Sequence, residues 1–337
     1  MNLAERVFGT LFGQAVGDAL GLGTEFMTRE QVAWHYPQGL TRYDQIIQDA
    51  HRKRWKPGAW TDDTEQMTMI LDSLLETGIV DVRDIGRRIS NWVFHARGEG
   101  VGNTVYAVLK HPGFTDDPHA AARAVWEQTG RRAAANGGVM RTSVLGLWDF
   151  PDPARICANA EAVCKVTHFD PRCVASCVAV SLLVNALARG RPADRTLFDE
   201  VRAIAARYDE RVSEPFERAA SPDIATLELD SEESIGYTMK PLAAGLWALA
   251  HARDFEDGLL RVVAQGGDAD SNGSVACALL GAHLGLNAIP DRLVRGLTTV
   301  RYLARVSREL LGRIAPGDDQ VAADARALEG DLQSGRP

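Results

Sequence analysis

The chain has 337 residues and carries 37 lysines and arginines against 45 aspartates and glutamates, which gives a formal net charge of −8. Its 45% content of apolar residues is that of a globular protein and excludes disordered, collagen-like and low-complexity chains. The acidic balance and the scattered arginines argue against general nucleic-acid binding. The length suits one large domain or two small ones, with ample residues for a core.

A membrane-spanning segment is not expected. The most apolar stretch, residues 174–188, is interrupted by Ser176, Ser181 and Asn185, and it is shorter than the roughly 20 residues that a spanning helix needs. The first ten residues lack the basic and apolar regions of a signal peptide. The five cysteines form no CxxC motif, so we expect buried, reduced thiols in a cytoplasmic protein.

Apolar residues recur at helical spacing along most of the chain. The expected helices begin near Leu3, Met67, Pro171 and Pro241, and two more occupy residues 259–263 and 275–284. No sustained two-residue alternation between turn signals indicates a sizeable sheet. The sequence therefore predicts an all-α fold, with one compact multi-helix domain over residues 1–314 and a polar, disordered tail over residues 315–337.

Two segments place carboxylates and hydroxyls together next to expected helices. They are TDDT, residues 61–64, and GGDADSN, residues 266–272. Helix capping explains either segment alone, because a side-chain oxygen of Thr, Asp or Ser accepts a hydrogen bond from a free backbone N–H. A cap uses only one oxygen, however. Each segment offers two carboxylates, which repel each other unless a cation lies between them.

The ligands in both segments are hard oxygen atoms, without the histidines and cysteines of a zinc or copper site. Such oxygens favour Mg²⁺ or Mn²⁺. If the two segments converge, their four aspartates could bridge two ions. These aspartates are Asp62, Asp63, Asp268 and Asp270.

Two further stretches carry weaker signals. GQAVGDALG, residues 13–21, combines helix-packing glycines with Asp18, which needs a partner if it is buried, and Glu25 follows in an expected loop. NGGVMR, residues 136–141, could bring backbone amides and Arg141 to a phosphate, although Asn-Gly-Gly is also an ordinary turn.

Taken in order, these segments resemble the ADP-ribosylglycohydrolase family. The matching stretches are GQAVGDALG, WTDDTEQM, GVGNT, NGGVMR, THFD, GYTMKPLAAGLWAL and GGDADSNGSVACALLGAHLG, which extend from about Gly9 to Gly285. The succession of TDDT and GGDAD is specific, whereas the other pieces are weak alone. The resemblance implies an all-α fold with two Mg²⁺ or Mn²⁺ ions in a central cleft, and hydrolysis of a glycosidic bond to ADP-ribose.

The resemblance also assigns roles to individual residues. It implies that the metal ligands are Thr61, Asp62, Asp63, Asp268, Asp270 and Ser271. The acids that could act in catalysis are Glu25, Asp62 and Asp270, and the sequence does not decide which is the base. The residues that would contact the ADP-ribose are Gly102, Asn103, Asn136, Gly137, Gly138, Met140, His168 and Tyr237, with Tyr237 stacked on the adenine.

Two positions depart from the family pattern. Some members have an aspartate just before VGNT that handles an arginine acceptor, and this chain has Gly100 there. Residues 238–240, Thr-Met-Lys, stand where many relatives have an acidic residue. Both departures leave the implied ADP-ribose site intact. They leave the acceptor open between arginine, serine and a nucleobase.

Other functions fit the same residues. A di-metal hydrolase of a nucleotide or phosphoester could use the same oxygen ligands. A catalytically weak chain could only bind ADP-ribose, or could be an immunity protein that blocks an ADP-ribosylating toxin, but the intact set of acids argues against lost activity. The expected partners are ADP-ribose and an ADP-ribosylated substrate, and the resemblance implies a monomer.

Overall fold

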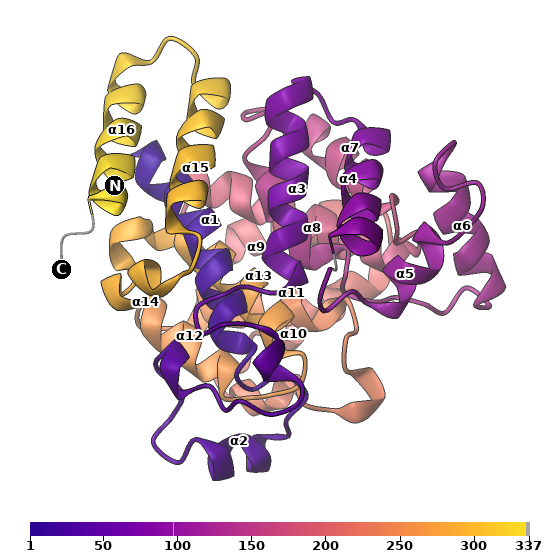
Figure 1. The fold of residues 1–337 in the computed structure, drawn as a ribbon, viewed down its shortest axis with the longest axis horizontal. Helices are drawn as coiled ribbons and strands as arrows, with labels where there is room; N and C mark the ends of the chain where they lie inside the picture. Colours follow the sequence, from indigo (N-terminus) through magenta and orange to yellow (C-terminus); the bar gives the residue numbers. More distant parts are fainter. Residues whose placement is uncertain (97, 335–337) are drawn as a thin grey trace.

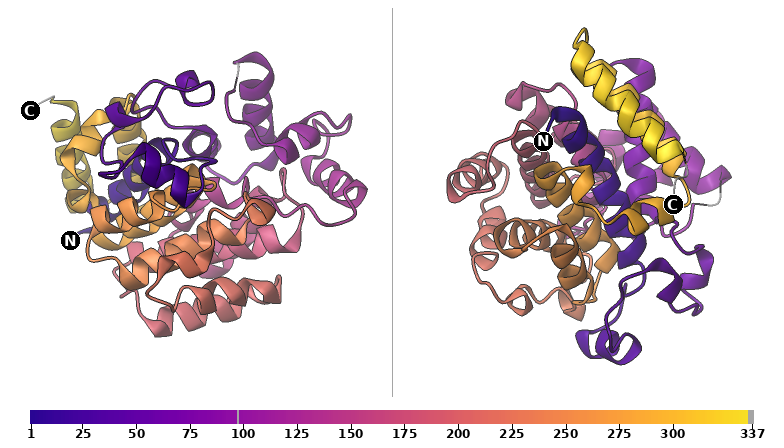
Figure 2. Two further views of the ribbon diagram at one scale, coloured as in Figure 1. Left: turned by 90° about the horizontal axis from the view of Figure 1, so that it is seen from below. Right: turned by 90° about the vertical axis from the view of Figure 1, so that its left-hand side faces the viewer.

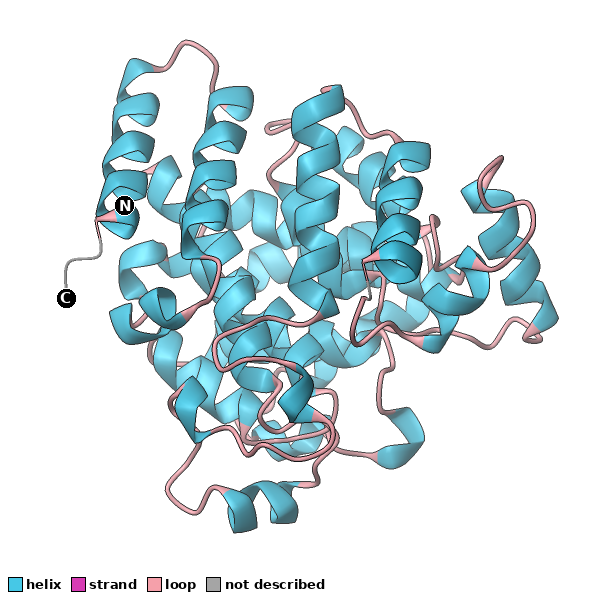
Figure 3. Ribbon diagram, in the orientation of Figure 1, coloured by secondary structure: helices cyan, strands magenta, loops and turns pink. Residues whose placement is uncertain are grey.

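The computed structural model describes residues 1–96 and 98–334, and their regular secondary structure is helical (Figures 1 and 3). The α-helices are α1 (Leu3–Gly21), α2 (Arg29–His35), α3 (Asp62–Thr77), α4 (Val82–His95), α5 (Asn103–Leu109), α6 (Pro118–Gln128), α7 (Pro153–Cys164), α8 (Pro171–Ala188), α9 (Arg195–Ala205), α10 (Ser213–Arg218), α11 (Met239–His251), α12 (Phe255–Val263), α13 (Ala269–Leu284), α14 (Asp291–Gly296), α15 (Val300–Ile314) and α16 (Asp319–Gln333).

Short 3₁₀ helices connect these elements. They are η1 (Tyr43–Gln45), η2 (Arg52–Arg54), η3 (Val139–Arg141), η4 (Ser143–Gly146), η5 (Glu210–Val212), η6 (Ile224–Leu227), η7 (Glu232–Ser234) and η8 (Leu286–Ala288). The described residues contain no β-strand, and Ala135 and Tyr237 form an isolated antiparallel bridge. The predicted all-α fold is confirmed.

Helices α1 and α13 form the antiparallel centre of the molecule (Figure 1). Small residues at every fourth position line their contact: Gly9, Gly13, Gly17 and Gly21 of α1 face Gly281, Cys277, Gly273 and Ala269 of α13. A Cβ atom on Gly17 would lie 2.1 Å from the carbonyl oxygen of Gly273, so the two backbones touch directly. This contact sets the loop after α1, which carries Glu25, beside the acidic segment that begins α13.

Replacing Gly17 with alanine tests this contact. We expect Gly17→Ala to lower the free energy of unfolding by about 3 kcal/mol, because the new methyl group meets rigid backbone atoms. Urea denaturation followed by circular dichroism measures the change. Gly312 is the matched control, since a Cβ there has no heavy atom within 4 Å, and alanine should raise stability by up to about 1 kcal/mol. Equal effects of the two substitutions would contradict the close contact.

Helix α8 belongs to the core. Its 18 residues are long and apolar enough to cross a membrane, but 89% of them are buried inside the protein. Its Asp170 cap and Pro171 start the helix where the sequence predicts one. The buried faces of α8 pack against α7, α9 and α13, as expected of a core helix.

The expectation of a polar, disordered tail over residues 315–337 is wrong for most of that segment. Residues Asp319–Gln333 form α16, which lies against α15 and α1 on the outside of the molecule (Figure 2). Asp318 caps the helix by accepting a hydrogen bond from the Val321 N–H at 3.0 Å. The apolar residues recur at helical spacing, with Ala325 and Leu332 buried, but polar and small residues between them hide the pattern. The remaining tail residues, 335–337, lie outside the described residues.

Candidate active site

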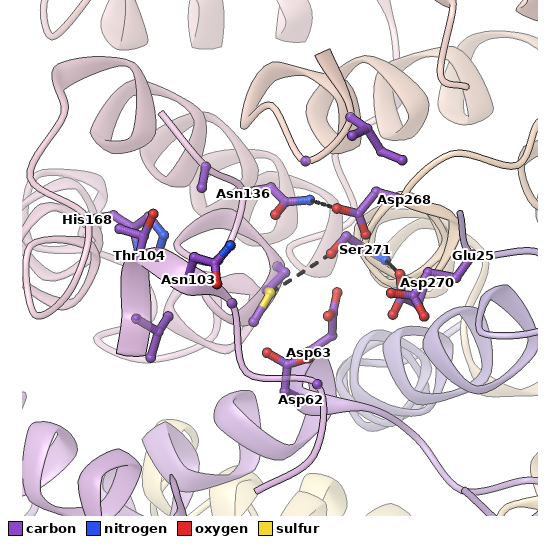
Figure 4. Close-up of a pocket in the computed structure, with 18 of the residues that line it drawn as sticks. Glu25, Asp62, Asp63, Asn103, Thr104, Asn136, His168, Asp268, Asp270 and Ser271 are labelled. Carbon is purple, nitrogen blue, oxygen red and sulfur yellow. Dashed lines mark hydrogen bonds between the residues drawn. The ribbon is translucent and has the colours of Figure 1, made fainter. Parts of the chain in front are cut away.

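The two acidic segments and Glu25 meet at one cavity of about 340 Å³ (Figure 4). Asp62 and Asp63 are the first residues of α3, Asp270 and Ser271 lie in the first turn of α13, and Glu25 follows α1. The predicted site residues that line the cavity are Glu25, Asp62, Asp63, Gly102, Asn103, Asn136, Gly137, Met140, His168, Asp268, Asp270 and Ser271. Segments more than 200 residues apart in the chain are therefore brought together as predicted.

Three of the acids form a compact group. Carboxylate oxygens of Glu25, Asp268 and Asp270 all lie within 4.8 Å of one another, close enough for one metal ion. Thr61 connects this group to the α3 acids, because its Oγ1 lies 3.4 Å from Asp270 Oδ2 and 3.5 Å from Asp63 Oδ2. Thr61 itself is buried behind the acids and is absent from the cavity wall.

The acids are held in an environment that opposes their ionisation. Burial, followed by the negative charges of Asp18 and Glu25, raises the pKa of Asp62 well above its usual value. Burial and the charges of Glu25 and Asp63 raise the pKa of Asp270 in the same way, and burial raises the pKa of Glu25. A divalent cation would relieve this repulsion, and the all-oxygen donor set fits Mg²⁺ or Mn²⁺.

Asp18 positions the first acidic segment. Its Oδ1 accepts a hydrogen bond from the Thr61 N–H and its Oδ2 one from the Thr64 N–H, each at 2.9 Å. The buried acid of α1 thus caps α3, which supplies the partner that the sequence did not reveal. Burial raises the pKa of Asp18 to about 6. The Thr61 hydroxyl also caps α3, since its Oγ1 accepts a hydrogen bond from the Asp63 N–H at 3.5 Å. The Asp62 and Asp63 carboxylates are not used in the cap and face the cavity.

Removing the Asp18 cap should destabilise the protein. In the presence of Mg²⁺, we expect Asp18→Ala to lower the free energy of unfolding by at least about 2 kcal/mol, because two buried N–H groups lose their acceptor. Urea denaturation measures it. Asp194→Ala is the control, since Asp194 caps the remote helix α9 and its loss should cost about 1 kcal/mol without loss of activity. An unfolding midpoint unchanged by Asp18→Ala would rule out the cap.

The second acidic segment is not a capping motif. Asp268 is the N-cap residue of α13, yet its side chain makes no cap hydrogen bond. Asp268 Oδ2 instead accepts a hydrogen bond from Asn136 Nδ2 at 2.9 Å across the cavity (Figure 4). Asp63 Oδ1 accepts one from Ser274 Oγ at 3.0 Å, which ties α3 to α13. The capping interpretation is therefore wrong for Asp268, while Asp270 Oδ1 accepts a hydrogen bond from the Ser271 N–H at 3.0 Å, and both carboxylates face the cavity.

A short loop after α1 holds Glu25. His51 Nε2 lies 2.5 Å from Glu25 Oε2, and the guanidinium of Arg52 donates to the backbone carbonyls of Glu25 and Gly23. The neighbouring Phe26 has φ of +61°, which is unusual for a bulky residue and leaves its ring exposed at the cavity rim. Sequence reasoning missed His51 and Arg52, because neither stands in a recognisable motif.

Three predicted substrate residues do not line the cavity. Arg141 is fully buried, and its guanidinium donates to Gln66 and Thr167 rather than facing the cavity. The prediction that Arg141 cradles a phosphate is therefore wrong, because its side chain is buried and does not line the cavity. Gly138 lies against the buried thiols of α7 and α8, and Tyr237 is half-buried, with the Arg172 guanidinium 5.8 Å from its ring centroid.

Comparison with known proteins agrees with this geometry. The family model described as ADP-ribosylglycohydrolase matches residues 1–320. The chain belongs to the ADP-ribosylglycohydrolase family. It is 29% identical over 300 residues to the ADP-ribosyl-[dinitrogen reductase] glycohydrolase of Rhodospirillum rubrum, covering 86% of this chain and 89% of that one.

Two further relatives extend the comparison. The ADP-ribosylarginine hydrolase Tri1 of Serratia proteamaculans is 23% identical, over 94% of this chain and 81% of its own. A solved structure described as an ADP-ribosylglycohydrolase-related protein complex aligns with a TM-score of 0.69 and 28% identity, over 92% of this chain and 98% of that one. Membership in the family makes the chain a hydrolase of glycosyl bonds that acts on ADP-ribosylated substrates.

Gly100, at the position where an aspartate was expected, adopts a conformation that suits glycine. Its φ is +89°, and a Cβ atom there would lie 2.6 Å from Asp62 Oδ1. A side chain at this position would therefore press on a cavity acid and adopt a strained backbone conformation. Position 100 offers only backbone to an acceptor, whereas the nearest carboxylate in sequence, Glu99, forms an ion pair with Arg54 outside the cavity wall.

Proposed function

We propose that this hydrolase releases free ADP-ribose from an ADP-ribosylated acceptor, using two divalent cations, Mg²⁺ or Mn²⁺. The observation that carries the proposal is the convergence of five carboxylates on one wall of a 340 Å³ cavity. These carboxylates belong to Glu25, Asp62, Asp63, Asp268 and Asp270. So many like charges are costly to bury together, and divalent cations would offset that cost.

The acids divide into two neighbouring sets. Glu25, Asp268 and Asp270 would hold one cation, and Asp62 and Asp63, with Thr61 between the sets, would hold the other. Bound divalent ions lower the pKa of a coordinated water and polarise oxygen ligands such as ribose hydroxyls. Ser271 could add its hydroxyl, since it lies in the same helical turn as Asp270.

The opposite wall suits the nucleotide part of the substrate. Asn103 and His168 lie across the cavity from the acids, and Asn136 lies between the two walls (Figure 4). Asn103 is the first residue of α5, so free backbone N–H groups of that helix are close by. Backbone N–H groups, amide side chains and an imidazole are neutral donors for the oxygens of a diphosphate and a ribose.

In the reaction, water replaces the acceptor at the anomeric carbon of the ribose. The bond between that carbon and the acceptor breaks as positive charge builds up on the ring, and the surrounding carboxylates stabilise this charge. Glu25 lines the cavity, with His51 Nε2 at 2.5 Å from its Oε2, and it can accept the proton of the attacking water. The departing acceptor takes up the proton that Glu25 received from the water, which leaves Glu25 ionised again, and it departs past Phe26 and Gly100.

A panel of substrates tests the proposal. ADP-ribose linked through arginine, serine or a nucleobase is incubated with Mg²⁺, Mn²⁺ or EDTA, and the products are separated by chromatography. We expect cation-dependent release of free ADP-ribose from at least one linkage, lost in Asp62→Ala and Asp270→Ala and retained in the cap control Asp194→Ala. Formation of AMP instead would show hydrolysis of the diphosphate bond and would identify a nucleotide hydrolase. Binding of ADP-ribose without release would favour a binding or toxin-blocking protein.

A further inference from the structure

Arg141 is a fully buried cation that has no acidic partner among the described residues. It lies in η3, directly behind the cavity residue Met140. One terminal nitrogen donates to Gln66 Oε1 at 2.6 Å, and the other donates to Thr167 Oγ1 at 2.7 Å. Burying a charge is costly, and here hydrogen bonds to neutral groups, without an acidic partner, offset that cost. A third acceptor is the Val163 carbonyl, at 3.4 Å, and the two side-chain acceptors lead to opposite walls of the cavity.

The first path leads to His168. Thr167 Oγ1 lies 2.8 Å from His168 Nδ1. Because arginine has no acceptor, Thr167 must accept from Arg141, and its single hydroxyl hydrogen remains to be placed. If Nδ1 carried a hydrogen, Thr167 would accept from both neighbours and its own hydrogen would have no acceptor in the described part of the chain. The hydroxyl therefore donates to Nδ1.

This direction of hydrogen bonding fixes the tautomer of His168. Burial, with the charge of Arg141, lowers the pKa of His168 to about 3, so the imidazole is neutral near pH 7 and carries one hydrogen. With Nδ1 as acceptor, that hydrogen is on Nε2. No group in residues 1–96 or 98–334 hydrogen-bonds to Nε2, and His168 lines the cavity beside Gly137. Nε2–H is thus available to an oxygen of a bound ligand.

The second path leads to Asp62. Because Arg141 donates to Gln66 Oε1, the amide nitrogen of Gln66 must point the other way, and it donates to Asp62 Oδ2 at 2.9 Å. Gln66 lies one helical turn after Asp62 on α3, which places the two side chains on the same face. The orientation of the amide, and with it one oxygen of Asp62, is therefore set by the same guanidinium.

We propose that Arg141 is a positioning residue that orients both walls of the cavity: through Thr167 it makes His168 present Nε2–H to an oxygen of the ligand, and through Gln66 it holds the Asp62 carboxylate. It acts without touching the ligand. The inference rests on the proposed function only in taking ADP-ribose as that ligand. The Arg141–Thr167–His168 path is the part that can be tested without cations or turnover.

The tautomer is measured directly. In protein labelled with ¹⁵N-histidine, long-range ¹H–¹⁵N correlation spectra at pH 7.5 without metal distinguish the two nitrogens, and His168→Gln assigns the signal. We expect wild type and Thr167→Ser to carry the hydrogen on Nε2. Thr167→Val removes the donor to Nδ1 while keeping the shape of the side chain, so we expect a mixture of tautomers. A hydrogen on Nδ1 in the wild-type protein would overturn the proposal.

Binding of ADP-ribose is the second readout. By calorimetry without metal, we expect Thr167→Val to weaken binding about five- to tenfold, and Thr167→Ser to stay within about twofold of wild type. Thr10→Val is the matched control, because Thr10 is also a buried threonine whose hydroxyl donates to a backbone carbonyl, at 2.8 Å from Arg6 O. A Thr167→Val protein with the wild-type tautomer, or with wild-type affinity, would contradict the proposed path.

Arg141→Lys completes the test. Lysine keeps the charge, but a single ammonium cannot reproduce the fork that reaches Gln66 and Thr167 together. We expect the same tautomer mixture as in Thr167→Val, and a wild-type spectrum would overturn the role of Arg141. If the wild-type protein hydrolyses none of the substrates, that result counts against the proposed function but not against the role of Arg141. Neither the spectra nor the calorimetry requires turnover. If ADP-ribose does not bind the wild type even when Mn²⁺ is added, the proposed function fails, and the spectra still decide the Arg141–Thr167–His168 path.

Discussion

Asp270→Asn should abolish activity while making the metal-free protein more stable. We expect the release of ADP-ribose to fall about a thousandfold, equivalent to about 4 kcal/mol of transition-state stabilisation, because an amide is a poor ligand for a divalent cation. The same change removes one of several buried like charges, whose repulsion and burial raise the pKa of Asp270. The melting temperature of the metal-free protein should therefore rise near pH 7.5.

For an aspartate that only stabilises the fold, we expect a lower melting temperature and unchanged activity. Asp84 lies in the first turn of α4, and although partial burial acts against it, hydrogen bonds from Arg88 and Arg87 lower the pKa of Asp84 to about 2. Asp84→Asn should lower the melting temperature and leave activity unchanged. Differential scanning calorimetry and the release assay compare the two variants. A destabilised, active Asp270→Asn protein would refute the role of Asp270 as a metal ligand.

The stability of the metal-free protein should fall as the pH rises, and cations should restore it. Burial raises the folded-state pKa of Asp62, Asp63 and Asp270 above the unfolded value near 3.9. The stability that these groups contribute is complete below the unfolded pKa and is lost as the pH rises through the folded pKa. Cations bind the ionised acids, so their stabilising effect should grow with pH.

Thermal denaturation from pH 5 to pH 8.5, with EDTA or with Mn²⁺, measures this effect. At a cation concentration 100 times the dissociation constant, the stabilisation should be about 2.7 kcal/mol. Calorimetric titration in buffers of different ionisation enthalpy should also show protons released as Mn²⁺ binds. Stabilisation that stays constant over this pH range, with no proton release, would contradict a cation site built from these acids.

The fold was predictable because most helices carry a regular apolar face. The periodicity near Leu3, Met67 and Pro171 corresponds to α1, α3 and α8. Helix α13 begins at Ala269, six residues before the predicted segment, because the GGDADSN residues themselves form its first turn. Helix α16 was missed because small and polar residues dilute its apolar positions.

The site was predictable in its residues but not in its connections. The repulsion between neighbouring aspartates indicated a cation, and the glycines of α1 and α13 then allow the two segments to meet. Spacing along the chain cannot show which buried polar groups join across helices, so Asp18, Ser274 and His51 had no assigned role. Gln66 could have been found, because it lies four residues after Asp62.

For Arg141, the sequence suggested a role that the structure does not support. Its place after two glycines suggests a phosphate ligand, but a glycine-rich turn can also direct an arginine inward. In the structure the side chain extends away from the cavity to Thr167 and Gln66. Sequence alone gives the residue type and not the direction of the side chain.

A crystal structure with Mn²⁺ and ADP-ribose would show whether the buried acids hold two cations beside the ribose. Anomalous scattering locates the cations independently of the ligand. We predict two Mn²⁺ ions among the carboxylates of Glu25, Asp62, Asp63, Asp268 and Asp270, with the ribose beside them and the diphosphate towards Asn103 and His168. Cations bound elsewhere, or ADP-ribose outside this cavity, would contradict the account.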